Sequence, residues 1–345
     1  MNKFSPMGGG SPEKENKKKI AIFAIAATAA LIALLLVVLA VVGIVSAIKN
    51  KNSDDDGEGD GGVSTAYTTK EVSESEIHLG YLQLLDETSV QKTAAELVQI
   101  ATLRPKNDSN KPIYYMDDMT NFYADEEALT AFNTMMTAYY KSLCDAAAAQ
   151  EAETPADTNI DIVKALKPNV ENFDPEYRLG TTFALHYYTE QKNDAGNLIT
   201  APINESIAEH KWIYENCAKY GFAVRYPATS QSAETGEGGQ TTANGSYIFR
   251  YVGVAHATYM TQKKLSLDAY VDFLINNTKA GSKAITISGA DGKKYQVYYA
   301  VREGENGEIL VPSSYTYSYS GDNKEGFIVT VNSSERVAKK TAETN

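Results

Sequence analysis

Histidines with acidic residues nearby are the side chains of this chain best suited to bind a metal ion or transfer protons. His186 and Glu190 lie four residues apart, and Glu209 and His210 follow in a later segment. Imidazole and carboxylate groups are common ligands of zinc. These residues therefore define one candidate metal site. A polar position at the end of a strand also explains His186, and we favour that interpretation.

Nucleophilic catalysis has little support in the sequence. Cys217 and His210 are seven residues apart on one predicted helix, a spacing of two turns that exceeds hydrogen-bond reach. The sequence contains no Gly-x-Ser-x-Gly motif and no Gly-rich phosphate-binding loop. Cys144 is the second cysteine, and its pairing with Cys217 in an oxidising compartment stays open.

Two segments in the second half of the chain carry a family resemblance. The first consists of Lys211-Trp212, Glu215-Asn216, Lys219-Tyr220-Gly221-Phe222 and Arg225-Tyr226-Pro227. The second consists of Phe249-Arg250-Tyr251-Val252-Gly253, Ala257-Thr258-Tyr259 and Leu265-Ser266-Leu267. In order and spacing they resemble the VanY-type zinc D-Ala-D-Ala carboxypeptidases, which remove the terminal D-alanine of peptidoglycan stem peptides. The match is good over residues 207–275 and weaker from Leu82 through residues 126–144.

The resemblance implies a zinc ion held by two His and one Asp, with an open position for water and a Glu as general base. The family motif Ser-x-His-x-x-Gly-x-Ala-x-Asp matches residues 175–184. Tyr177 stands there in place of the first zinc His, and Ala184 in place of the zinc Asp. The motif Glu-x-x-His matches a second stretch, where Gly245 replaces the base and Ile248 the last zinc His.

These replacements predict a pseudoenzyme without a cofactor, its zinc lost. Alanine and isoleucine side chains have no lone pair for a metal, and a neutral phenol is a poor zinc ligand. The family also has a substrate-holding Arg in a Gly-Tyr-Arg-Ser segment, and residues 146–175 contain no Arg. The remodelled ligand cleft is expected to contain Tyr177, His186, Tyr247, Arg250 and His256. For Arg250 we favour an internal ion pair, and for His256 a half-buried position with its hydrogen bonds satisfied.

Three functions follow from this resemblance. The first is a non-catalytic surface protein that binds peptidoglycan stem peptides or a cell-surface protein. The second is an active zinc carboxypeptidase with relocated ligands. The third is an interaction or assembly module that works through its C-terminal strands, where Tyr315, Tyr317 and Tyr319 alternate. Such alternation is typical of a half-buried strand face as well as of a sugar- or peptide-stacking surface.

One stretch of the chain is long and apolar enough to span a membrane. Residues 20–48 contain no charged side chain, and a bilayer core needs roughly 20 apolar residues of helix. Lysines precede the stretch more densely than they follow it, which predicts a cytoplasmic N-terminus and an exported C-terminal domain. Seven lysines and two glutamates give residues 1–52 a charge of +5. The whole chain has a net charge of −12, so residues 53–345 carry −17. This acidic part argues against nucleic acid as a partner.

The expected fold class is α+β, with helices on a small antiparallel sheet, as the resemblance implies. Helices are predicted from Glu126, over residues 206–220 and after Ser266, and short strands recur from residue 284 onward. The expected organisation lists six parts: a cytoplasmic disordered tail (1–19), a transmembrane helix (20–48), an acidic flexible stalk (49–75), a carboxypeptidase-like domain (76–280), a small β appendage (281–335) and a disordered tail (336–345).

Overall fold

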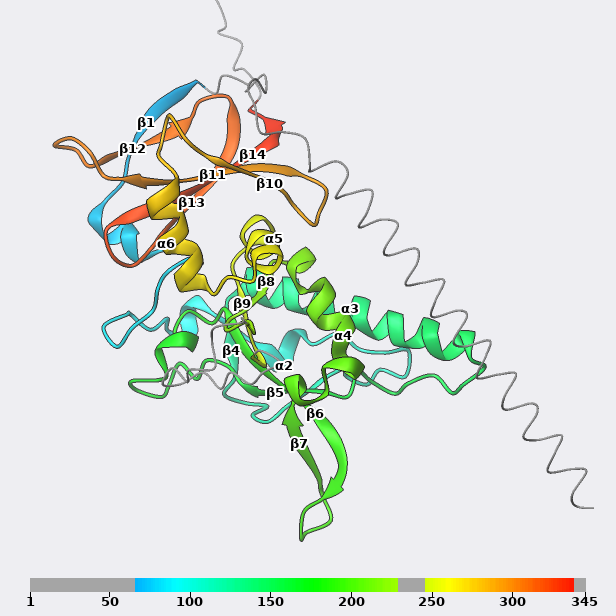
Figure 1. Cartoon of the computed structure of the whole chain (residues 1–345). Coiled ribbons are helices and arrows are strands. Elements are labelled where there is room, and N and C mark those ends of the chain that lie inside the picture. Colours follow the sequence, from blue (N-terminus) through cyan, green and yellow to red (C-terminus); the bar gives the residue numbers. More distant parts are fainter. Residues whose placement is uncertain (1–65, 229–245, 338–345) are drawn as a thin grey trace, which may run out of the picture. The chain divides into compact units, whose positions relative to one another are not determined.

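The computed structural model describes residues 66–228 and 246–337, and Figure 1 shows their arrangement. These residues belong to one compact unit, residues 65–345. The predicted membrane-spanning segment, residues 20–48, and Gly245 lie outside the described residues. Within the described ranges, every helix is too short or too polar to cross a bilayer.

A six-stranded mixed sheet forms the centre of the first part of this unit. Its strands run in the order β3 (Tyr115–Met116), β5 (Ile160–Lys164), β6 (Thr182–Lys192), β9 (Ile248–Tyr251) and β8 (Phe222–Val224), and β7 (Leu198–Pro202) pairs with β6. The pairing of β3 with β5 is parallel, whereas the other pairs are antiparallel. Strands β6 and β7 continue into a hairpin that projects from the sheet (Figure 1).

One face of this sheet packs on helices. The long helix α3 (Glu126–Ala149) begins at Asp125, whose side chain accepts hydrogen bonds from the N–H groups of Glu127 and Ala128. Phe132 of α3 stacks on Phe183 of β6, with ring centroids 4.7 Å apart. Helix α4 (Ile207–Asn216) adds Ile213 to the same core. The helix predicted from Glu126 is therefore confirmed, and the one predicted over residues 206–220 is confirmed as α4 followed by a 3-10 turn.

Short elements complete the described unit. They are η1 (Glu74–His78), η2 (Ala94–Glu96), β2 (Val98–Gln99), α2 (Ile100–Leu103), β4 (Tyr123–Ala124), η3 (Pro175–Tyr177), η4 (Ile203–Ser206) and η5 (Cys217–Tyr220). Gly221 ends η5 in the left-handed conformation (φ 81°), as expected for a C-cap glycine.

The C-terminal strands form a second sheet, which α5 (Val254–Lys263) and α6 (Leu267–Asn277) join to the first. Its four antiparallel strands run in the order β10 (Ile285–Ser288), β11 (Lys294–Val301), β14 (Gly326–Arg336) and β13 (Tyr315–Gly321). Apolar residues of α5, α6 and β11 share one core, which includes Val271 and Val297. Ser266 caps α6 by accepting a hydrogen bond from the Ala269 N–H, as predicted.

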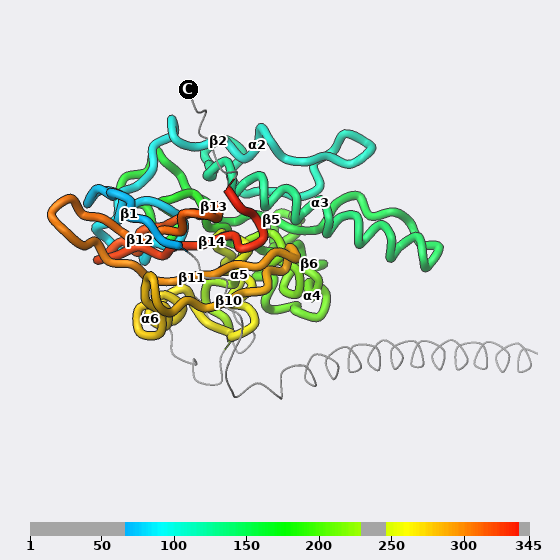
Figure 2. Tube along the Cα trace, turned by 90° about the horizontal axis from the view of Figure 1, so that it is seen from above, coloured from blue at the N-terminus to red at the C-terminus, as the bar shows by residue number. Residues whose placement is uncertain are grey.

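Several local predictions need correction. Helix α5 lies in a segment for which no helix was predicted. The expected stalk, residues 49–75, contains β1 (Tyr67–Glu71) at its end. Strand β1 pairs antiparallel with β12 (Glu308–Pro312), and the two lie side by side in Figure 2. Such pairing between distant segments is non-local, so local patterns do not reveal it.

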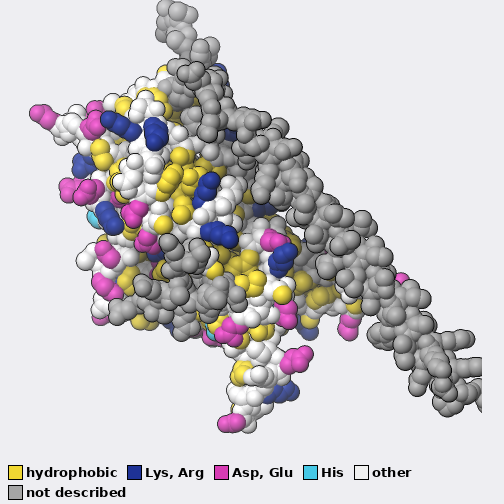
Figure 3. Space-filling view, in the orientation of Figure 1, with side chains coloured by type: hydrophobic (Ala, Val, Ile, Leu, Met, Phe, Trp, Pro, Cys, Tyr) yellow, Lys and Arg dark blue, Asp and Glu magenta, His cyan; other side chains and the backbone are white. Residues whose placement is uncertain are grey.

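Charged side chains of both signs are interspersed over the surface. Figure 3 shows Lys and Arg side chains among Asp and Glu side chains on one face of the described residues. That face therefore offers no continuous basic area to an anionic polymer.

Candidate functional site

The face of the first sheet opposite α3 holds most of the predicted site residues. Side chains alternate along a strand, so Thr182, Ala184 and His186 of β6 point to this face. Their paired neighbours are Arg250 and Ile248 on β9 and Asp161 on β5. We call this surface the site face. The intervening residues, such as Phe183 and Leu185, enter the core under α3.

The three positions that the motif match predicts to replace zinc ligands come together at the middle of the site face. Tyr177, Ala184 and Ile248 belong to one buried cluster with Leu166, and each is at most 3% exposed. Tyr226 and Tyr247 pack against the cluster from its edges. We call Tyr177, Ala184, Ile248 and Leu166 the apolar plug.

The surroundings of Tyr177 keep its phenol neutral. Burial, followed by the nearby Asp174 and Glu176 carboxylates, raises the pKa of Tyr177 well above its ordinary value. The Lys164 ammonium lies over the Tyr177 ring, 4.6 Å from its centroid, and forms a 2.6 Å ion pair with Asp174. Lys164 therefore covers the Tyr177 ring of the plug while its ammonium group is paired with Asp174.

The residues of the plug do not fit a catalytic zinc ion. Such an ion needs about three protein ligands with lone pairs, and of the three positions only Tyr177 has an oxygen. Among the residues that the structure describes, no group of three His, Cys, Asp or Glu side chains is placed to hold a metal. Gly245, which corresponds to the general base, lies outside those residues.

An ion cluster flanks the plug on one side. The Glu176 carboxylate accepts hydrogen bonds from Arg225 Nε at 2.8 Å and from Arg250 Nη1 at 2.9 Å. Arg225 also reaches Asp268 at 2.7 Å. The Thr182 hydroxyl donates to Glu176 at 3.2 Å. Burial opposes the ionisation of Glu176, yet the two guanidinium groups hold its pKa below the ordinary value. The internal ion pair predicted for Arg250 is thus confirmed.

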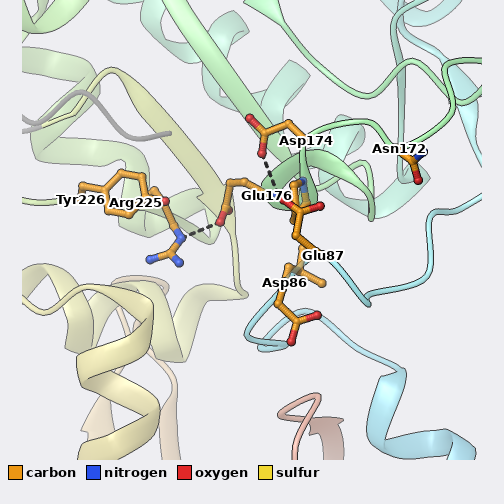
Figure 4. A pocket seen from close by; sticks show the side chains of 9 residues that line it. Asp86, Glu87, Asn172, Asp174, Glu176, Arg225 and Tyr226 are labelled. Carbon is orange, nitrogen blue, oxygen red and sulfur yellow. Dashed lines mark hydrogen bonds and ion pairs between the residues drawn. The ribbon is translucent and has the colours of Figure 1, made fainter. Parts of the chain in front are cut away.

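A polar pocket opens beside this cluster (Figure 4). Its volume is about 470 Å³, and it lies between the loop 85–87 and the segment 172–176. Arg225 and Tyr226 close it on the third side, with the Arg225 guanidinium 4.6 Å from the Tyr226 ring centroid. Because Tyr226 also packs against the plug, the pocket adjoins the plug. Its size lies within the range of small-ligand sites.

A pair of acidic residues flanks the plug on the other side. Asp161 is 1% exposed, and neither of its carboxylate oxygens has a hydrogen-bond partner among the described residues. Burial and the neighbouring Asp117 raise the pKa of Asp161 to about 7. Burial together with the two carboxylates also raises the pKa of Tyr188 to about 12. This acid pair therefore holds a proton near neutral pH.

The structure brings only part of the predicted cleft together. His186 and Tyr247 are neighbours, with ring centroids 5.3 Å apart, and His186 Nδ1 lies 3.1 Å from the Thr200 hydroxyl. Burial lowers the pKa of His186. His256 instead lies near the second sheet, within hydrogen-bond distance of the Tyr270 and Thr330 hydroxyls at 2.9 and 2.8 Å.

This position of His256 corrects its assignment to the cleft and supports the satisfied-histidine interpretation. Burial lowers the pKa of His256 to about 3, so the ring is neutral at physiological pH.

The residues of the alternative metal site are not assembled. His210 is buried on the α3 side of the sheet, with its ring centroid 5.0 Å from that of Tyr187. Glu190 and Glu209 are exposed, on β6 and α4 respectively. The two cysteines are free thiols, Cys217 in the core and Cys144 partly exposed on α3.

Sequence reasoning missed Glu176, Arg225 and Asp161 as site residues. Glu176 directly precedes Tyr177 within the motif segment, and Arg225 and Arg250 lie in the other segments that match the family. The presence of one acidic and two basic residues in the matching segments was therefore an available signal for an ion cluster. Asp161 interrupts the apolar run Ile160-Asp161-Ile162-Val163. An acidic residue within a buried strand is the signal that would have identified it.

Comparison with known proteins gives one sequence relative and several structural neighbours. No family model matches the chain. A D-alanyl-D-alanine carboxypeptidase from Enterococcus faecium is 36% identical over 159 residues, which cover 44% of this chain and 47% of that protein. The chain thus spans about half the length of this curated relative. The sequence match confirms the predicted resemblance to VanY-type zinc D-Ala-D-Ala carboxypeptidases.

Two solved structures illustrate the structural neighbours. The vancomycin-resistance D,D-dipeptidase VanXYg, in complex with a D-Ala-D-Ala phosphinate analogue, has a TM-score of 0.46 and 18% identity, and the match covers 77% of this chain and 99% of that one. VanYB in complex with D-alanine-D-alanine has a TM-score of 0.27 and 17% identity, and the match covers 56% of this chain and 97% of that one.

Proposed function

We propose that this chain is a non-catalytic relative of the D-Ala-D-Ala carboxypeptidases that binds peptidoglycan stem peptides. The observation that supports the proposal is the apolar plug, in which Tyr177, Ala184 and Ile248, the residues that the motif match assigns to the zinc-ligand positions, are buried together. Among the described residues of the plug, no side chain can hold a Lewis acid that would acidify a water molecule. The central sheet and the Glu176 ion cluster surround the plug.

The pocket beside the ion cluster is the proposed peptide-binding position. It adjoins the plug through Tyr226, and Asp86, Glu87 and Asp174 give it carboxylates that can accept hydrogen bonds from a peptide's N–H and ammonium groups. Stem peptides are the first ligands to test because of the sequence relative. A cell-surface protein that inserts a peptide segment here is the alternative occupant.

The proposal includes a membrane location. Residues 20–48 would anchor the chain, with the N-terminus in the cytoplasm and the described unit outside. Protease added to intact cells should digest the described unit and spare the N-terminal tail. Protection of the whole chain until the cells are opened would contradict this orientation.

Metal analysis tests the loss of catalysis directly. The purified full chain, equilibrated with zinc and then desalted, should hold only substoichiometric zinc and should release no D-alanine from a stem pentapeptide. A stoichiometric zinc content accompanied by D-alanine release would replace the proposal with an active, diverged carboxypeptidase.

A variant with restored ligands sharpens this test. The combined substitutions Tyr177→His, Ala184→Asp and Ile248→His should increase zinc binding above that of the parent, because they return donor atoms to three adjacent positions. Circular dichroism must first show that this variant folds.

Peptide binding is tested separately, by calorimetric titration of the parent and a Tyr226→Ala variant with the stem pentapeptide. Absence of heat with the parent would remove the ligand from the proposal.

A further inference from the structure

A second cavity lies between the two sheets, away from the site face. Its volume is about 450 Å³, and its lining includes Tyr81, Glu127, Tyr251, Asp291, Tyr295 and Ser318. These residues come from the loop 80–82, the first turn of α3, the end of β9, the β10–β11 turn, the start of β11 and β13. The cavity is separate from the peptide pocket, with which it shares no lining residue.

Three tyrosine rings of this cavity are held in place by carboxylates. The hydroxyls of Tyr81 and Tyr251 both donate to Glu127, at 2.9 and 2.7 Å. The Tyr295 hydroxyl donates to Asp291 at 2.6 Å. The rings of Tyr81 and Tyr251 meet edge to face, with centroids 5.1 Å apart. A ligand that packs on these rings therefore loses little free energy to the ordering of side chains.

The same carboxylates keep capacity for a ligand. A carboxylate has about four acceptor positions, so Glu127 and Asp291 can each accept further hydrogen bonds after those from tyrosine. Lys293 contributes an ammonium donor, and Ser318 an exposed hydroxyl. The cavity thus combines aromatic walls with fixed hydrogen-bond acceptors and a few donors.

We propose that this cavity binds a neutral saccharide. The apolar C–H groups of a pyranose ring can pack on the tyrosine rings while its hydroxyls donate to Glu127 and Asp291. With Lys293 as the single basic side chain of the lining and two acidic ones, the cavity disfavours phosphate and other anions. Its volume suits a ligand of one or a few sugar rings.

Calorimetric titration of the full chain with triacetylchitotriose, cellotriose and maltotriose tests this proposal. At least one of these neutral sugars should bind. Removing the ring with Tyr295→Ala should lower the affinity for that sugar by about tenfold or more, as for other aromatic anchors of a binding site. The Tyr295→Phe variant keeps the ring but releases Asp291, and it should weaken binding less.

Tyr115→Ala is the matched control, because Tyr115 is an exposed tyrosine outside the cavity whose hydroxyl also donates to an aspartate, Asp157 at 2.9 Å. It should leave sugar binding unchanged. Absence of heat with all sugars, or equal weakening by Tyr115→Ala and Tyr295→Ala, overturns the proposal. A Tyr295→Ala variant that loses the stem pentapeptide but no sugar would reassign the cavity to peptide. None of these outcomes depends on the zinc content.

Discussion

Two buried carboxylates on opposite sides of the apolar plug have opposite surroundings. Glu176 faces the guanidinium groups of Arg225 and Arg250, and these cations keep its pKa below the ordinary value. Asp161 has no hydrogen-bond partner among the described residues and lies near Asp117, and its pKa rises to about 7. One acid is therefore ionised and paired, whereas the other gains or loses its proton near neutral pH.

On the same sheet face, one buried carboxylate therefore stabilises the folded state and the other destabilises it. The Glu176 cluster ties η3 to β8 and β9 and so holds Tyr177 in the plug, which is a structural role. Among the residues that the structure describes, the Asp161 carboxyl has no well-placed hydrogen-bond donor to offset its desolvation, only a weaker interaction with the Tyr188 hydroxyl. Its burial therefore opposes folding, most strongly when it is ionised.

The largest effect is expected when Glu176 is neutralised. In the Glu176→Gln variant two buried guanidinium groups lose their shared counter-charge, and Arg250 is only 1% exposed. The free energy of unfolding should fall by about 3 kcal/mol or more, as for other broken buried ion pairs. Urea denaturation of the full chain, followed by tyrosine fluorescence or circular dichroism, measures this loss.

Glu87→Gln is the control for that variant. Glu87 pairs with Arg178 at 3.2 Å, but its side chain is 85% exposed. Removing its charge should change the unfolding free energy by less than about 1 kcal/mol. Equal losses in the two variants would show that burial does not distinguish the Glu176 cluster.

An intermediate effect is expected at Asp161, and it should depend on pH. The folded-state pKa of about 7 lies above the ordinary value of about 4, so ionisation is the change that folding penalises. The stability of the parent relative to Asp161→Asn should decrease as the pH rises from about 4 to about 7. Denaturation of both proteins at several pH values tests this slope.

Above neutral pH the Asp161→Asn variant should be the more stable protein by about 1–3 kcal/mol, the usual cost of an unsatisfied buried polar group. The new amide can also donate to the Asp117 carboxylate. Glu176 should behave oppositely, because stability from a lowered carboxyl pKa is lost as the pH falls below about 4. An Asp161→Asn variant that is less stable than the parent at high pH would mean that the Asp161 carboxylate has a favourable partner.

The smallest effect should come from Thr182, which supports the Glu176 cluster from β6. Thr182→Val keeps the shape of the side chain but removes the 3.2 Å hydrogen bond to Glu176. The expected loss of unfolding free energy is about 1 kcal/mol, because both arginines still satisfy the carboxylate. The same urea titration measures it, and a loss as large as that of Glu176→Gln would assign the stability of the cluster to the hydroxyl.

Much of the local structure could be predicted from the sequence because it depends on neighbouring residues. Asp125 starts α3, Gly221 ends η5 and Ser266 starts α6 as expected. The first sheet was only partly predicted, since β5 and β6 contain polar residues, among them Asp161 and His186, that interrupt a simple apolar pattern. The position of β1 depends on pairing with β12, far along the chain, which no local pattern encodes.

The candidate site was predictable where it followed the family motifs. Tyr177, Ala184 and Ile248 were expected to replace zinc ligands, and the structure brings them together. The placement of His256 failed because its position in sequence, close to Arg250, does not reveal that α5 turns it toward Thr330. The acid pair was missed because it requires β3 and β5 to lie side by side.

The pairing of β1 with β12 has a mechanical consequence. Strand β1 is the first element of the described chain, and five residue pairs join it to β12. A pulling force that reaches the unit through the preceding residues would therefore load this short ladder before any other strand. Tension on the chain would be borne first beside the second sheet, remote from both the plug and the peptide pocket.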